Sequence, residues 1–273
     1  MKYYNKELLL ALCKEIDMPE EISNEVAAFT EVFDISNVAH LVEDLNIPHK
    51  AEKANEALVA LGDDEKGIRI LTLHLTAALK ARELYAQKGI SDDIYLHTMG
   101  DFTLFVREQL ERVGYYRFTV AFWTWRALSL LLFRLGELEF EMNNFEGRNI
   151  ISTHIPANAV MTREGLDASY KWCREFFAKY FSDFVYEDIC CYTWLLAPVL
   201  KTMLPEGSKI LNFMADYEII RSNPDSQEFM IRIFRKEYPD LASLPENTSL
   251  QRAVKKHLLA GGKVGDAFGR YTG

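Results

Sequence analysis

Residues 137–155 read ELEFEMNNFEGRNIISTHI, and this stretch decides the fold class of the C-terminal half of the chain. Leucine, phenylalanine and methionine alternate with glutamate over residues 137–142, which is the period of a half-buried β-strand. Residues 149–155 form a second run rich in β-forming residues, and the Asn-Asn pair and glycine of residues 143–148 indicate a turn between the two runs. The stretch therefore predicts a β-hairpin.

The segments after this hairpin alternate between helical and extended patterns. In chain order we expect a helix capped by Thr162, an interior strand over residues 188–196, a short helix from Pro198, a helix capped by Ser208, an extended segment over 217–222 and a helix over 249–260. The glycines after the last helix, Gly261 and Gly262, indicate a helix stop followed by a flexible tail. This half therefore reads as an α+β domain with a sheet flanked by helices.

The N-terminal half has a different pattern. Apolar residues recur at three and four positions over nearly all of residues 4–113, which predicts five or six helices and no strand. Residues 119–132 (TVAFWTWRALSLLL) are apolar almost all round, which predicts a buried helix that joins the two halves. We therefore expect a helical domain over residues 1–118 and an α+β domain over residues 119–273.

Composition and charge exclude several classes of protein. The formal net charge is −9 and no run of five like charges occurs, which disfavours nucleic acid and membrane surfaces as partners. The apolar run near the N-terminus covers only residues 8–12, which is too short for a signal peptide or a membrane span, so we expect a cytoplasmic protein. The four cysteines are expected to be free and mostly buried, because a chain with 49% hydrophobic residues does not need disulfides.

The common catalytic motifs are absent from the sequence. G-x-S-x-G, H-E-x-x-H, paired C-x-x-C, the P-loop and G-x-G-x-x-G do not occur. The histidines outside the hairpin have no metal-ligand spacing, so no metal cofactor is expected. These absences disfavour α/β hydrolases, zincins, zinc ribbons, P-loop NTPases and classical dehydrogenases.

The glutamates of the first strand provide a candidate catalytic face, because the two-residue period places them on one side of the sheet. Glu137, Glu139 and Glu141 share this face, and if Met142 pairs with Asn149 across the turn, Glu139 lies opposite Ser152 and Glu137 lies opposite His154. A histidine next to a carboxylate is suited to act as a general base near neutral pH. The alternative is a solvated face with ordinary cross-strand pairs, and a slip of one residue would remove the alignment.

The connection after His154 provides a candidate anion site. A loop follows Ile155 and leads to the helix capped by Thr162, where free backbone N–H groups and the neighbouring Arg163 would bind a phosphate. The alternative is an ordinary connection between a strand and a helix. Trp194, near the end of the interior strand predicted over residues 188–196, is a candidate for the lining of a pocket.

Four segments carry a resemblance to a known family. They are FWTWRALSLLLFRLGELEFEM (122–142), ISTHIP (151–156), YTWLLAP (192–198) and SLQRAVKKHLLAGGKVG (249–265). The chain resembles the bacterial N-acyltransferases that join a helical N-terminal domain to a GNAT-like C-terminal domain. The resemblance covers nearly the whole chain and implies a mixed sheet flanked by helices.

The resemblance also implies a function. In such folds two central strands, here those ending near Ile155 and Leu196, splay to admit an acyl-coenzyme A. Backbone amides at the splay point polarise the thioester carbonyl, and the following helix receives the pyrophosphate. We therefore expect transfer of an acyl group from acyl-coenzyme A to a small-molecule amine, in which positioning and electrostatics supply most of the rate.

The candidate site residues follow from these roles. Glu139 or His154, with Glu137 beside them, would act as the base and Tyr217 as a weaker candidate acid. Ile155, Thr162, Arg163 and Trp194 would bind the cofactor. The family's R/Q-x-x-G-x-G/A loop is missing, and residues 157–165 (ANAVMTREG), with a single glycine, stand in its place. The alternative function is therefore that of a catalytically silent binding protein that has lost the pyrophosphate loop.

Overall fold

The computed structural model describes residues 2–273 and divides the chain into two units, one that ends at Leu135 and one that runs from Gly136 to Gly273. The sequence pattern suggested a boundary at residues 118/119 instead. The difference arises because α7 (Ala121–Leu128) packs against α4 (Pro48–Val59) and α5 (Ile68–Gln87) of the first unit.

The first unit is built from helices. Its remaining elements are α1 (Lys6–Glu15), α2 (Glu20–Val32), the 3₁₀ turn η1 (Ile35–Asn37), α3 (Ala39–Asp44), α6 (Asp92–Val113) and the short strand β1 (Leu132–Leu135). Asn5 caps α1 by accepting a hydrogen bond from the Leu8 N–H at 2.9 Å. Over the described part of residues 4–113 there are six α-helices and no strand, so the prediction from the helical spacing is confirmed.

The predicted joining helix over residues 119–132 is wrong in extent, because α7 ends at Leu128. The chain turns at Leu130, which has a positive φ of 58°, and continues as β1. The Arg134 N–H donates to the Thr98 Oγ1 of α6 at 3.0 Å, so the chain from Leu132 onward is extended beside α6 rather than helical.

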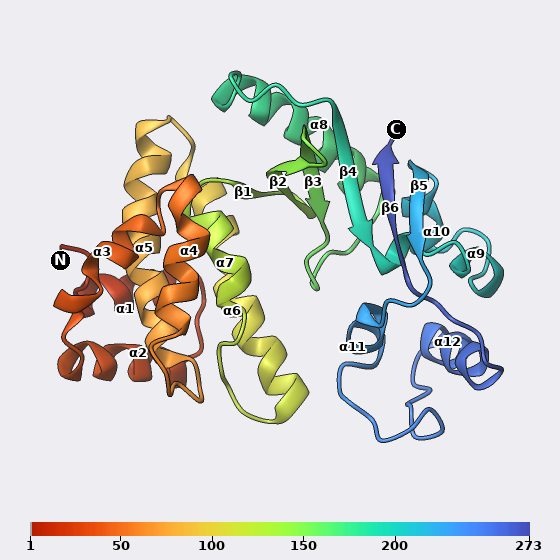
Figure 1. The fold of residues 1–273 in the computed structure, drawn as a ribbon, viewed down its shortest axis with the longest axis horizontal. Coiled ribbons are helices and arrows are strands. Elements are labelled where there is room, and N and C mark those ends of the chain that lie inside the picture. The colour runs from red at the N-terminus through yellow and green to blue at the C-terminus, as the bar shows by residue number, and fades with distance from the viewer. Residues whose placement is uncertain (1) are drawn as a thin grey trace. The chain divides into compact units, whose positions relative to one another are not determined.

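The second unit contains a mixed sheet (Figure 1). Its strands are β2 (Leu138–Phe145), β3 (Arg148–His154), β4 (Asp188–Thr193), β5 (Tyr217–Asn223) and β6 (Asp266–Tyr271), and its helical elements are α8 (Arg163–Tyr180), η2 (Trp194–Leu196), α9 (Leu200–Met203), α10 (Lys209–Met214), α11 (Glu228–Phe234) and α12 (Ser249–Leu259). Within this unit the strand order is β2-β3-β4-β6-β5, in which only β3 and β4 are parallel. The prediction of an α+β fold is confirmed.

The hairpin of β2 and β3 is present, but its turn is tighter than the predicted turn over residues 143–148. Glu146 and Gly147 both have positive φ, 52° and 81°, as a two-residue turn of type I′ requires. Asn143 and Asn144 therefore lie inside β2, and the predicted pairing of Met142 with Asn149 is wrong, since Met142 pairs with Ile151. The register differs by two residues, so each side chain stays on its predicted face.

Two other predictions were wrong in the second unit. The interior strand ends at Thr193 rather than residue 196, because the Thr193 side chain accepts a hydrogen bond from the Leu195 N–H and caps η2. The predicted C-terminal tail is instead β6, which lies between β4 and β5. Its first four residues are all buried, so it lacks the alternation that marks a strand exposed on one face.

Helix α8 covers one face of the sheet (Figure 1). Its buried stripe includes Tyr170, Cys173, Phe176 and Phe177, and the Tyr170 ring meets the Phe140 ring of β2 edge-on at 5.6 Å. This face therefore carries the core of the unit. The four cysteines are free and buried, as the composition predicts.

Candidate functional site

The strands β3 and β4 separate inside the sheet. Their ladder has three residue pairs and ends where Ser152 lies opposite Cys190. Beyond this point β3 continues to His154 on β2, while β4 continues to Thr193 on β6. Each strand is thus held on its outer side only, and the two inner edges open into a splay whose diverging ends can be followed in Figure 1.

A histidine and two glutamates lie together on the face of the splay opposite α8. Glu139 pairs with His154 across the β2-β3 ladder and Glu141 pairs with Ser152. The His154 Nε2 lies 2.8 Å from the Glu141 Oε2, and the two glutamates are only 3% and 7% exposed. The structure therefore contains a hydrogen-bonded histidine and carboxylate, but the carboxylate is that of Glu141, which the sequence prediction did not select.

Glu137 lies elsewhere, so its predicted position opposite His154 is wrong. Gly136 has a φ of 76°, and the resulting turn places Glu137 before β2. Its Oε2 accepts a hydrogen bond from the Val160 N–H at 2.5 Å, and its own N–H donates to the Ser169 Oγ at 2.9 Å. Glu137 thus contacts the loop between β3 and α8 rather than the face that carries Glu139, Glu141 and His154.

The α8 face of the splay carries a buried polar cluster that includes Tyr217. Its hydroxyl shares a short hydrogen bond with that of Tyr170 from α8. Thr153 and Cys191, the first residues beyond the last β3-β4 pair, lie close enough to change the pKa values of these phenols. Burial raises the pKa of both tyrosines well above the ordinary value, so both are neutral at pH 7. Tyr170, Thr153 and Cys191 were not predicted, because in the sequence they have the spacing of ordinary core residues.

The start of α8 has the predicted cap. The Thr162 side chain accepts a hydrogen bond from the Gly165 N–H at 3.1 Å. The Arg163 guanidinium contacts Asp216 at 2.6 Å and Asp167 at 2.5 Å, so its charge is shared by two carboxylates. A phosphate at this helix start would compete with them for Arg163.

Ile155 and Trp194 follow the diverging strands, one after β3 and the other at the beginning of η2. Both side chains are half-buried. They therefore lie at the ends of the two strands that separate, where the prediction placed them.

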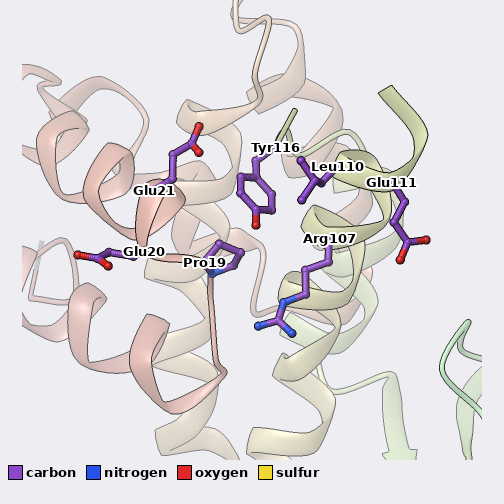
Figure 2. Close-up of a pocket in the computed structure, with 7 residues that line it drawn as sticks. All are labelled: Pro19, Glu20, Glu21, Arg107, Leu110, Glu111 and Tyr116. Atoms are coloured by element: carbon purple, nitrogen blue, oxygen red, sulfur yellow. The ribbon is translucent and has the colours of Figure 1, made fainter. Parts of the chain in front are cut away.

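The first unit contains a separate cavity of about 560 Å³ between the start of α2 and the end of α6. Figure 2 shows Pro19, Arg107, Leu110 and Tyr116 around its centre, with the carboxylates of Glu20, Glu21 and Glu111 at its edge. The Arg107 guanidinium is bound to Asp17 at 2.6 Å. Among the described residues 2–273 no group of three potential metal ligands occurs, and none of the helices there has the length and apolar character of a membrane span.

Family models identify both halves of the chain. The model of the GNAT-like C-terminal domain matches residues 132–271, and that of the N-acyltransferase N-terminal domain matches residues 7–130. The chain belongs to this N-acyltransferase family. The resemblance to N-acyltransferases with an N-terminal domain of this type and a GNAT-like C-terminal domain is thereby confirmed.

Solved structures share the fold. An acyltransferase in complex with decanoyl-CoA and teicoplanin is 22% identical, with a TM-score of 0.80 over 97% of this chain and 87% of that chain. The complex of an acyltransferase with decanoyl-CoA alone is 20% identical, with a TM-score of 0.80 over 97% of this chain and 88% of that chain. A mutant acyltransferase in complex with octanoyl-CoA is 21% identical, with a TM-score of 0.80 over 96% of this chain and 86% of that chain. No curated protein matches the chain.

Proposed function

We propose that the protein transfers an acyl group from an acyl-coenzyme A to an amine. The observation that carries this proposal is the splay of β3 and β4 after Ser152 and Cys190, which leaves backbone N–H and C=O groups of two adjacent strands without a ladder partner. The family supports the proposal, as do the similar folds that hold decanoyl-CoA and octanoyl-CoA.

The acyl donor would bind along the open edge of β3. Beyond Ser152 the edge of β3 has no ladder partner on β4, and backbone N–H groups on that edge would polarise the thioester carbonyl, as the donors of an oxyanion hole do. The phosphates would lie at the start of α8, where the helix presents unpaired N–H groups near Thr162. Ile155 and Trp194 would border the pantetheine arm, and Arg163 would exchange a carboxylate for a phosphate oxygen.

The amine would be activated by His154. With Glu141 fixing the orientation of its ring, His154 would accept a proton from the attacking amine, directly or through one water molecule. The nitrogen forms a bond to the carbonyl carbon, the carbon–sulfur bond breaks, and its electron pair leaves with the sulfur. A second group returns a proton to the thiolate, and the neutral phenol of Tyr217 is the candidate for this step. Glu139 pairs with His154 across the β2-β3 ladder and is the second candidate for the base.

The test begins with thermal unfolding in millimolar decanoyl-CoA, acetyl-CoA and free coenzyme A. A ligand at about a hundred times its dissociation constant stabilises the fold by about 2.7 kcal/mol, which raises the melting temperature by a few degrees at this size. Absence of a shift with every donor would refute the proposal. A shift without turnover in a screen of amines would favour the silent binding protein instead.

The catalytic assignment is tested by turnover. We expect His154→Gln to lower kcat by about a hundredfold or more with the melting temperature retained. The matched control is His40→Gln, because His40 is exposed on α3 of the first unit. Equal turnover in wild type and His154→Gln would remove His154 from the reaction.

A further inference from the structure

Val160, in the loop between β3 and α8, is held through both of its backbone groups. Its N–H donates to the Glu137 Oε2 at 2.5 Å, and its carbonyl oxygen accepts a hydrogen bond from the Lys209 Nζ at 2.8 Å. The two side chains come from distant parts of the unit's sequence, one immediately before β2 and one at the start of α10. The Val160 side chain itself is 55% exposed, so hydrophobic burial does not fix this part of the loop.

Glu137 is itself tied to the first turns of α8. Its backbone N–H donates to the Ser169 Oγ at 2.9 Å, and that hydroxyl donates to the Gly165 carbonyl oxygen at 2.8 Å. A Cβ at Gly165 would lie 2.9 Å from the Glu137 Cγ and 2.9 Å from the Thr162 Oγ1. The Glu137 side chain therefore packs against the helix start, and only glycine fits beneath it.

From these contacts we infer that Glu137 and Lys209 are positioning residues that hold the β3–α8 loop in the conformation that receives the phosphates of the acyl-coenzyme A. This inference rests on the proposed function. The loop connects the splayed end of β3 to the N-terminus of α8, so its conformation sets the distance between the groups that bind the thioester and those that bind the phosphates. If this distance changes, binding weakens, because the acyl-coenzyme A cannot contact the thioester-binding groups and the phosphate-binding groups at the same time.

This role differs chemically from that of a general base. Glu137 accepts a hydrogen bond from an amide N–H, and the carbonyl oxygen of a glutamine accepts the same bond without a charge. A general base needs a protonatable oxygen, which glutamine lacks. Glu137→Gln therefore separates positioning from proton transfer, and Glu137→Ala removes both.

The experiment compares the full-length wild type with Glu137→Gln, Glu137→Ala and Lys209→Met, and uses Lys171→Met as the matched control. Lys171 is an exposed lysine of α8, and its Nζ lies 4.0 Å from the Glu175 Oε1 of the same helix. The readouts are KM for decanoyl-CoA, kcat and the dissociation constant of free coenzyme A by titration calorimetry. Amide hydrogen exchange of residues 157–162 without ligand reports directly on the order of the loop.

We expect Glu137→Ala and Lys209→Met each to raise KM and the dissociation constant about three- to tenfold, the effect of losing one exposed hydrogen bond, with kcat nearly unchanged. Glu137→Gln and Lys171→Met should stay within about twofold of wild type, and exchange in the loop should accelerate only in the first two variants. A large fall in kcat for Glu137→Gln would assign proton transfer to Glu137 and overturn the inference. Unchanged binding in Glu137→Ala and Lys209→Met would overturn it while leaving the proposed function intact, whereas a wild type that binds no coenzyme A would refute the proposed function itself.

Discussion

His74 of α5 is a buried histidine that contacts a hydroxyl group and two aromatic rings. The residue is fully buried, and its Nδ1 lies 2.8 Å from the Thr124 Oγ1 of α7. The rings of Phe102 and Phe118 meet the imidazole edge-on, with centroids 6.4 Å and 6.2 Å away. Burial among these groups lowers the pKa of His74 from 6.5 to about 3.

The sign and size of the effect on stability follow from this pKa. The unfolded chain binds a proton at this histidine below pH 6.5, whereas the folded chain does so only near pH 3. The contribution is therefore fully present above pH 6.5 and is lost as the pH falls. At pH 4.5, about two pKa units below the unfolded value, the loss amounts to about 3 kcal/mol.

The assay is urea unfolding at pH 7.0 and pH 4.5, followed by circular dichroism. For wild type and each variant the quantity compared is the difference in free energy of unfolding between the two pH values. We expect His74→Gln to reduce this difference by about 2 to 3 kcal/mol, and His40→Gln, which removes an exposed histidine, to leave it nearly unchanged. Equal differences in wild type and His74→Gln would refute the assignment of a depressed pKa to His74.

Three further predictions concern single positions. Glu141→Gln should lower kcat at least tenfold and leave KM for acyl-CoA unchanged, as steady-state kinetics would show, because it removes the carboxylate that orients His154; an unchanged kcat would exclude that role. Gly67→Ala should cost about 3 kcal/mol or more in urea unfolding, since a Cβ there would lie 1.8 Å from the Phe118 carbonyl oxygen, whereas Gly62→Ala, with open space around it, should cost about 1 kcal/mol; equal costs would contradict the steric argument. Tyr217→Phe should cost about 1 kcal/mol because it leaves the buried Tyr170 hydroxyl without its partner, and adding Tyr170→Phe should cost little more; full additivity would show that the two hydroxyls are not coupled.

The first unit was predictable because its information is local. Helix α1, for example, buries Leu9, Leu12 and Cys13, which have the three- and four-residue spacing of one helix face. The extent of α7 was not predictable in this way. Residues 129–132 are as apolar as the helix before them, and only the positive φ of Leu130 and the contact of β1 with α6 end the helix.

The hairpin shows which errors a prediction of a site tolerates. The alternation in β2 fixed which side chains share a face, and a register error of two residues left Glu139 and His154 on the same face. The choice of partner for His154 depends on the register itself, so Glu141 was missed. That register depends on the positive φ of Glu146 in the turn. Glutamate rarely adopts this conformation, so the sequence of the turn does not predict it.

The buried side of the splay could not be predicted from the sequence. Thr153, Tyr170, Cys191 and Tyr217 come from four different elements, and the insertion of β6 beside β4 helps to bring β5 into place. β6 follows a glycine-rich segment typical of a chain end, and burial on both faces removes its alternation. Contacts of this kind depend on the pairing of strands that are far apart in the sequence, and the spacing of apolar residues within one segment does not predict that pairing.

The structure of the β3–α8 loop explains why residues 157–165 need only one glycine. Glycine is required where the backbone adopts a positive φ that side chains resist or where another group approaches too closely for a Cβ. In this loop the positive φ falls on Met161, at 56°, within the left-handed region that other residues tolerate at moderate cost. The close approach falls on Gly165, against Glu137 and Thr162. The single glycine therefore occupies the position where a Cβ would come too close to neighbouring side chains. At Val160 the backbone is held by hydrogen bonds to the side chains of Glu137 and Lys209, whereas a glycine-rich loop would adopt its conformation without such side-chain contacts.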